Sequence, residues 1–351
     1  MTFDQIISGL QNKVYHPVYF LSGEEPYYID LIADYIQDHV LNEMEKEFNL
    51  SVYYGRDTDI NTLIGAAKRF PMMSNYQVVI LREAQTMPNL VPGAKVDKDG
   101  PKKKEKNEKH PLEAYVENPL KSTILVICYK YKTIDKRKSF AKTIDKSGVL
   151  FESAKLYDDK IPAWITHHAK EKGLSINPKA TMLLAESLGS DLCRIVNEMD
   201  KLTLNIPAGT EITPELVEMY IGISKDYNVF ELQKAIGRKD ISKSNQIMNH
   251  FASNPKENPL IMTISILFSF FSKLMLLHSS ADKSRPALAS LLSVNPFFLN
   301  DYLDAAKNFS SDRIHKIISL LREYDMKAKG VDNITTEESE LMREMLWKII
   351  H

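Results

Sequence analysis

At 351 residues, the chain is long enough for about two or three domains. Its 45 basic and 46 acidic residues give a formal net charge of −1, so bulk charge predicts no strong attraction to nucleic acid or anionic lipid. Cys128 and Cys193 lie far apart without a CxxC pair, which argues against a disulfide framework or a zinc site. The first residues lack the basic and apolar regions of a signal peptide, and we expect a cytoplasmic protein.

Residues 1–152 alternate short apolar strands with helices, which predicts a mostly parallel sheet covered by helices. The strands are apolar along their length, as is typical of a sheet buried on both faces. The predicted strands are Val18–Leu21, Leu50–Tyr54, Val78–Leu81, Thr123–Cys128 and Val149–Phe151. The predicted helices are Tyr27–Val40, Ile60–Arg69, Leu112–Val116 and Lys136–Asp145.

The turn after the first predicted strand stands where a nucleotide-binding domain carries its phosphate loop, G-x-x-x-x-G-K-[ST]. Gly23 matches the first glycine. Tyr28, Ile29 and Asp30 then occupy the positions of the second glycine, the lysine and the hydroxyl residue. Two glutamates follow Gly23 directly and would repel a triphosphate. These residues predict the frame of an ATPase without its phosphate site.

A second predicted strand, Val78–Leu81, ends at Arg82. An ATPase of this class places an aspartate there to hold Mg²⁺, and an arginine cannot bind a cation. The two absences together favour a non-hydrolysing relative of an ATPase. We therefore expect no catalytic residue, no metal site and no cofactor.

Residues 89–110 insert a polar segment into this domain. From Lys95 to Lys109 it holds seven lysines and four acidic residues. Such a composition cannot bury a core, so we expect a surface loop. Its lysines could contact a nucleic-acid backbone, but a solvated loop without a partner is the favoured interpretation.

The rest of the chain predicts helices without strands, first a small module at 153–222 and then a longer domain at 223–351. Predicted helices of the module are Asp158–Lys172, Pro178–Ser187, Ser190–Leu204 and one that begins at Thr213. Those of the last domain are Val229–Gly237, Ile241–Phe251, Leu260–His278, Ala287–Leu292, Pro296–Asn308, Ser311–Ala328 and Thr336–Ile350.

The most apolar stretch, Leu260–Leu277, approaches the length of a membrane span. Five polar residues interrupt it between positions 263 and 273, so we expect a buried core helix and no membrane contact. Trp164 and Trp347 lie on predicted helices among apolar residues and are expected in the core. Asp240 and Ser311 are the expected N-caps of their helices.

Three groups of residues carry a family resemblance. They are Gly23-Glu24-Glu25-Pro26-Tyr27, the run Phe70-Pro71-Met72-Met73 ahead of Val78–Ala84, and Gly189–Arg194 with Glu198–Leu202. In combination they resemble the delta subunits of bacterial DNA polymerase III clamp loaders, which belong to the AAA+ class. The resemblance covers the whole chain, although the C-terminal third matches only in helical character and length.

The resemblance implies an α/β plus all-α chain of three AAA+-like domains: an α/β domain at 1–152, a helical lid at 153–222 and a collar at 223–351. It implies a clamp-loader subunit of the replicative holoenzyme, a DNA-directed DNA polymerase, that binds and opens the sliding clamp for loading onto primed DNA. Neighbouring subunits hydrolyse ATP. The implied partners are the clamp, the ATPase subunits and a delta-prime-like subunit, the last two through the collar.

The run Phe70-Pro71-Met72-Met73 follows an amphipathic helix and precedes a buried strand, so the chain turns there. Its apolar side chains either pack under the sheet edge or project as an anchor for a partner's pocket. The residues alone favour packing. The resemblance favours the anchor, because the clamp-binding apolar pair of the family falls on Met72 and Met73.

Two other functions stay open at this point. One is an AAA+-type ATPase with an unconventional phosphate site, which would need a lysine and a cation ligand near Gly23. The other is a helical scaffold protein unrelated to replication, which would have no affinity for a sliding clamp.

Overall fold

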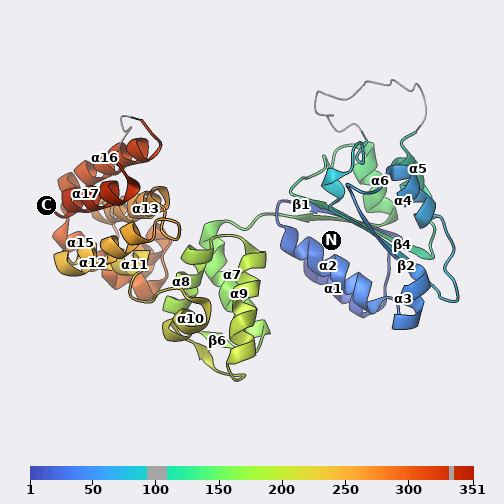
Figure 1. Ribbon diagram of the computed structural model, residues 1–351, viewed down its shortest axis with the longest axis horizontal. Coiled ribbons are helices and arrows are strands. Elements are labelled where there is room, and N and C mark those ends of the chain that lie inside the picture. The colour runs from blue at the N-terminus through green and yellow to red at the C-terminus, as the bar shows by residue number, and fades with distance from the viewer. Residues whose placement is uncertain (93–108, 332–335) are drawn as a thin grey trace. The chain divides into compact units, whose positions relative to one another are not determined.

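The computed structural model describes residues 1–92, 109–331 and 336–351, which form two compact units (Figure 1). The first unit is Met1–Leu156 and the second is Tyr157–His351. Most of the lysine-rich insertion predicted at 89–110 lies outside the described residues. The α/β plus all-α class predicted from the sequence is confirmed, with a five-stranded sheet in the first unit.

The sheet of the first unit is parallel throughout, in the order β2-β3-β4-β1-β5. Its strands are β1 (Val18–Gly23), β2 (Leu50–Tyr54), β3 (Gln77–Arg82), β4 (Thr123–Lys130) and β5 (Val149–Ser153). All residues of β1 and β4 are buried, as expected for strands covered on both faces. The expectation is wrong for β2, which is partly exposed because it is an edge strand with β3 as its single neighbour.

Helices cover both faces of this sheet (Figure 1). One face packs against α1 (Phe3–Gln11) and α2 (Pro26–His39), and the other against α4 (Ile60–Ala67), α5 (Pro111–Glu117) and α6 (Ser139–Ser147). A short helix, α3 (Glu43–Asn49), leads into β2, and the 3₁₀ turn η1 (Ala84–Thr86) follows β3.

The sequence did not predict α1 or α3. The reason is plain for α3, which buries no apolar residue, so hydrophobic periodicity cannot reveal it. What starts this helix is a capping box. The Asn42 side chain accepts the backbone N–H of Glu45, and the Glu45 carboxylate accepts that of Asn42.

The second unit is mainly helical. Its first part contains η2 (Asp158–Lys160), α7 (Ile161–Glu171), α8 (Pro178–Leu188), α9 (Leu192–Asn205) and α10 (Pro214–Ile221). Its second part contains α11 (Val229–Gly237), α12 (Ile241–Ser253), α13 (Leu260–Ser279), α14 (Arg285–Leu292), η3 (Pro296–Phe298), α15 (Leu299–Asn308), α16 (Ser311–Ala328) and α17 (Glu338–Ile350). The expected absence of strands is wrong, because β6 (Ser175–Ile176) and β7 (Glu211–Ile212) pair in parallel. The boundary at 222 stays a prediction.

Helix α13 is the centre of the second unit's main core. By length and apolar content it could cross a membrane. Its buried residues recur at helical spacing and pack with side chains of α16 and α17, and the ring of Phe271 meets that of Phe309 at 5.4 Å. The predicted core helix is therefore confirmed.

Two smaller expectations for this unit are wrong. Trp347 is 61% exposed, because α17 turns its other face, including Met345 and Ile349, into the core. The N-cap of α16 is Ser310 rather than Ser311, and its hydroxyl accepts the backbone N–H of Arg313. Asp240 caps α12 as predicted.

We expect Phe271→Ala to lower the free energy of unfolding by about 3–5 kcal/mol, because it leaves a cavity in the core around α13. The matched variant Phe268→Ala removes a half-exposed ring from the same helix and should change stability by no more than about 0.5 kcal/mol. Denaturant titration of both variants checks this. Equal losses would contradict the assignment of the two helix faces.

Candidate functional site

The two sites expected from the sequence lie at opposite ends of the parallel strands. One is at the sheet edge formed by the carboxyl ends of the strands, and the other is at the edge formed by their amino ends. Gly23 ends β1 and Arg82 ends β3, so both stand at the edge where the strands have their carboxyl ends. The run from Phe70 to Met73 precedes β3 and stands at the other edge. The structure thus gathers the degenerate nucleotide positions in one place and separates them from the apolar loop.

The loop after β1 is closed by the protein's own backbone. The N–H of Gly23 donates to the carbonyl of Lys132 at 2.9 Å, and that of Glu25 donates to the carbonyl of Ser153 at 3.3 Å. A phosphate loop keeps such N–H groups for the ligand. Gly23 has φ +138°, and a Cβ placed there would lie 2.0 Å from the Ser153 carbonyl oxygen. Any side chain at position 23 would therefore collide with β5, so glycine is needed here for the close packing of β1 against β5.

The amino end of α2 is occupied as well. Glu25 is the N-cap, and its carboxylate accepts the N–H of Tyr27 at 3.0 Å, where a phosphate would otherwise meet the positive end of the helix. Ile29, at the lysine position, is fully buried in the core between α2 and the sheet. Tyr28, at the second glycine position, packs its ring on Phe3 at 4.8 Å.

Asp30, at the hydroxyl position, belongs to a network of ion pairs. Its carboxylate lies 2.8 Å from the Lys130 ammonium and 3.6 Å from the Arg82 guanidinium. Arg82 also meets Asp34 at 2.6 Å, and Lys130 meets Glu83 at 3.0 Å. The cations at this edge are therefore side chains of the protein, placed where a nucleotide-binding relative would hold phosphate and Mg²⁺.

The network keeps its two cations charged despite partial burial. Burial alone would lower the pKa of Lys130, but hydrogen bonds to Asp30 and Glu83 offset it and raise that pKa above its usual value. The pKa of Arg82 is raised in the same way, since the hydrogen bond to Asp34 and the charges around it outweigh desolvation. Sequence analysis missed Lys130 and Asp34. The one available signal was a lysine ending an otherwise apolar strand.

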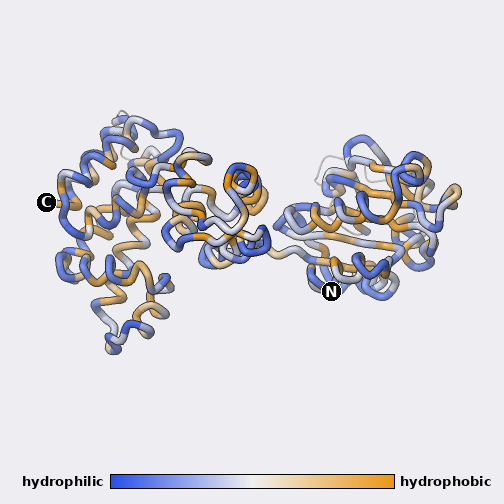
Figure 2. Tube along the Cα trace, turned by 90° about the horizontal axis from the view of Figure 1, so that it is seen from below, coloured by the Kyte–Doolittle hydropathy of each residue, from blue (hydrophilic) through white to orange (hydrophobic). Residues whose placement is uncertain are grey.

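At the opposite edge, the run Phe70–Met73 is an exposed loop. Met72 is 61% exposed, Met73 is fully exposed, and Phe70 is also turned to solvent. In Figure 2 the trace projects here, at the right-hand end of the first unit, with hydrophobic colouring. The packing interpretation favoured by the residues alone is therefore wrong, because among the described residues these side chains are mostly exposed and not tucked under the sheet.

Asn49 holds the loop from beneath through two hydrogen bonds. This side chain is buried, and its amide oxygen accepts the N–H of Met72 at 2.6 Å while its amide nitrogen donates to the Met72 carbonyl at 2.9 Å. Gln77 holds the base of the loop by donating to the Arg69 carbonyl at 2.6 Å and to the Thr123 hydroxyl at 2.7 Å. Both residues escaped sequence analysis, because an isolated amide carries no periodic signal.

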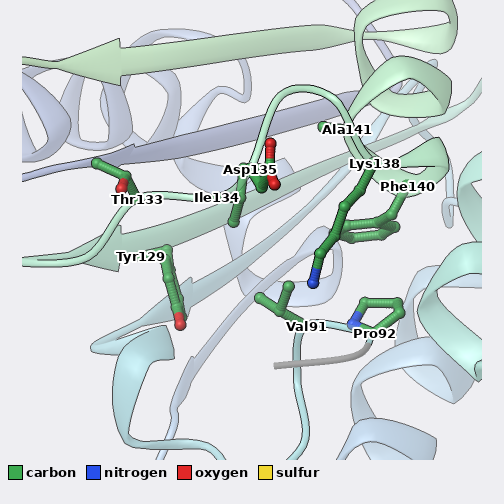
Figure 3. Close-up of a pocket in the computed structure, with 9 residues that line it drawn as sticks. All are labelled: Val91, Pro92, Tyr129, Thr133, Ile134, Asp135, Lys138, Phe140 and Ala141. Carbon is green, nitrogen blue, oxygen red and sulfur yellow. The ribbon is translucent and has the colours of Figure 1, made fainter. Parts of the chain in front are cut away.

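A small cavity of about 100 Å³ lies on the α6 side of the sheet (Figure 3). Tyr129, Ile134 and Phe140 line it, and the ammonium of Lys138 points toward Pro92. Ligand pockets have volumes of about 300–1,000 Å³, so this cavity is too small for a nucleotide. None of its lining residues belongs to the ion-pair network. The residues that the structure describes contain no cluster of three metal-ligating side chains.

Comparisons with known proteins match both parts of this architecture. A family model described as DNA polymerase III, delta subunit, matches residues 19–154, and a model of the C-terminal domain of that subunit matches residues 226–346. The chain belongs to the DNA polymerase III delta subunit family. The resemblance seen in the motifs is thereby confirmed.

Individual relatives extend over nearly the whole chain. DNA polymerase III subunit delta of Bacillus subtilis (strain 168) is 29% identical over 339 residues, 95% of this chain and 93% of that protein. The solved structure of the Bacillus subtilis DNA clamp loader delta protein is 25% identical, covers 99% of both chains and superposes with a TM-score of 0.52. The roles of single residues at the two sheet edges stay predictions.

We expect the purified chain to show no saturable ATP binding at millimolar concentration. The reason is that Glu25 caps the helix end where a phosphate would bind, Ile29 stands at the lysine position, and Arg82, which pairs with Asp34, stands at the metal position. Isothermal titration calorimetry measures this, with an active AAA+ ATPase as the positive control. A saturable heat of binding would contradict the closed site.

We expect Asn49→Ala to release the loop, because the Met72 N–H and carbonyl lose their partners. Leaving such groups unpaired costs about 1–3 kcal/mol. Hydrogen exchange of the Met72 amide should become faster in this variant. Asn75→Ala, which changes an exposed asparagine of the same loop, should leave the exchange rate unchanged. An unaltered rate in Asn49→Ala would show that this asparagine does not hold the loop.

Proposed function

We propose that this chain is a clamp-loader subunit that binds the sliding clamp through Phe70, Pro71, Met72 and Met73. In this role it helps to open the clamp for loading onto primed DNA. The observation that carries the proposal is the exposed loop held by Asn49, in a chain of the delta subunit family.

Physical reasons make this loop suited to a partner's pocket. Exposed methionine side chains are flexible and polarisable, so they fit apolar pockets of irregular shape. The backbone of Met72 is already ordered by two hydrogen bonds, so little conformational entropy of the loop is lost on binding. Apolar anchors of this kind carry most of the binding energy in many protein interfaces.

The closed edge at Gly23 and Arg82 supports a subunit that does not hydrolyse ATP. Hydrolysis then belongs to neighbouring ATPase subunits of the loader. The alternative of an ATPase with an unconventional phosphate site is not favoured, because the lysine position is buried and the metal position holds Arg82. A helical scaffold unrelated to replication is not favoured, because the family is one of replication proteins.

The C-terminal residues 223–351 form the proposed collar, through which the chain joins the ATPase subunits and a delta-prime-like subunit. The match of residues 226–346 to the C-terminal domain of the family and the separate core around α13 support this. The chain then works in the cytoplasm as part of a DNA polymerase holoenzyme, and DNA contact occurs within that assembly. The lysine-rich insertion has no part in the proposal.

We expect Met72→Ala/Met73→Ala to weaken clamp binding by well over tenfold. Anchors of this kind cost about 2 kcal/mol or more when truncated, and about 1.4 kcal/mol is already tenfold in affinity. The melting temperature should hardly change, because both side chains are exposed. Surface plasmon resonance with the clamp from the same cell measures the affinity.

Assembly with the other loader subunits provides the internal control. The double variant leaves the second unit intact, so it should still enter the loader in normal amount. A fall in melting temperature with unchanged clamp affinity would refute the anchor.

A further inference from the structure

A second pair of exposed apolar side chains lies on α3. Met44 is 80% exposed and Phe48 is 68% exposed. They are four residues apart, so they share one face of the helix. The rest of the helix is polar, with three glutamates, a lysine and an asparagine. In the part of the chain that the structure describes, no residue buries these two side chains, and an exposed aromatic ring beside an exposed methionine makes this face a candidate interaction surface.

Side-chain hydrogen bonds join helix α3 to the loop at Met72. Asn49, the last residue of α3, makes both hydrogen bonds that hold Met72. The pKa of Glu45, one turn earlier, is lowered first by the backbone N–H of Asn42 and then by the hydroxyl of Ser74 in the loop. Figure 1 shows that the chain between α4 and β3 passes close to α3.

The helical spacing of α3 puts Met44 and Phe48 on a face next to the one that meets the loop of Met72 and Met73. Residues 45 and 49 point to the loop, and residues 44 and 48 follow about 100° around the helix. Met44 and Phe48 therefore border the face that carries Met72. A protein surface that receives Met72 comes directly against this helix, because Asn49 links the two at hydrogen-bond distance.

The size of a stable interface points to the same conclusion. A specific complex buries about 800 Å² on each partner, with about 20–30 residues a side. A loop of four residues cannot supply that area alone. The face of α3 extends the apolar surface, and polar groups such as the Lys46–Glu43 ion pair lie at its border, as in the rim of many interfaces.

We propose that Met44 and Phe48 form a second apolar contact with the sliding clamp, beside the contact of Met72 and Met73. The proposal rests on the clamp-binding function proposed above. It assigns α3 to the clamp and not to a neighbouring loader subunit, because Asn49 joins α3 directly to the loop at Met72. The loop alone would anchor the clamp, and α3 would set its orientation.

The test compares clamp affinity of the full-length chain and of Met44→Ala/Phe48→Ala. We expect about tenfold weaker binding or more, with an unchanged melting temperature and normal entry into the loader. The matched control is Leu204→Ala/Met219→Ala, which removes two exposed apolar side chains from helices of the second unit. That control should bind the clamp like the unaltered chain.

A second variant, Phe48→Glu, places a charge in the proposed contact. We expect it to weaken clamp binding more than Phe48→Ala, because a charge buried in an apolar contact lacks a partner. It leaves the core untouched, since Phe48 is exposed. Equal affinities of the two variants would argue that the ring stays in solvent in the complex, and would overturn the proposal.

Met72→Ala/Met73→Ala is measured beside these variants to separate the two proposals. Weaker binding in the loop variant with unchanged binding in the α3 variant would overturn the α3 contact alone. Unchanged binding in both would overturn the loop anchor as well. Loss of loader assembly in the α3 variant, with clamp affinity intact, would assign this surface to another subunit and overturn the proposal.

Discussion

Parallel pairing of the five strands is the constraint on which the rest of the first unit depends. In such a sheet every strand has its carboxyl end at one edge, so loops that follow strands and loops that precede them are kept apart. The positions that correspond to a phosphate loop and to a metal ligand collect at the first edge, around Gly23 and Arg82. The exposed loop at Met72 belongs to the second edge. Each edge can therefore change without disturbing the other, because the buried strands β1 and β4 separate them.

At the first edge, side chains of the protein carry the charges that a nucleotide and its metal would supply in a nucleotide-binding relative. A bound nucleotide supplies negative charge at the helix terminus and a metal at the strand end. Here Glu25 provides the negative charge, and Arg82 and Lys130 provide the positive charges. Ion pairs of this kind add little net stability in themselves, since desolvation offsets the attraction. Their effect is to pair the cations of Arg82 and Lys130 with carboxylates of the protein itself, and the apolar core beneath continues to hold the fold.

The second edge differs from the first in leaving apolar side chains uncovered. Its side chains are exposed and apolar, while its backbone is fixed by buried amides of Asn49 and Gln77. Rigid support combined with uncovered apolar surface is what a preformed binding element requires, because little entropy is lost when a partner covers it. The same amide of Asn49 joins α3 to the loop. The loop and the helix face at Phe48 are the two parts of the proposed clamp contact.

The sequence by itself determined the five strands, most of the helices and the absence of the second glycine and the lysine of a phosphate loop. Those features are local: apolar runs bury in a sheet, helical periodicity buries one face of α13, and Ile29 and Arg82 cannot do the chemistry of lysine and aspartate. Only the tertiary structure decided that Met72 and Met73 are exposed, that α3 exists and that Lys130 reaches Asp30. Trp347 likewise faces solvent although its neighbours are apolar. The exposure of Met72 and Met73 and the pairing of Lys130 with Asp30 depend on how segments far apart in the chain meet. Helix α3 begins at a local capping box but buries no apolar residue, so hydrophobic periodicity does not reveal it.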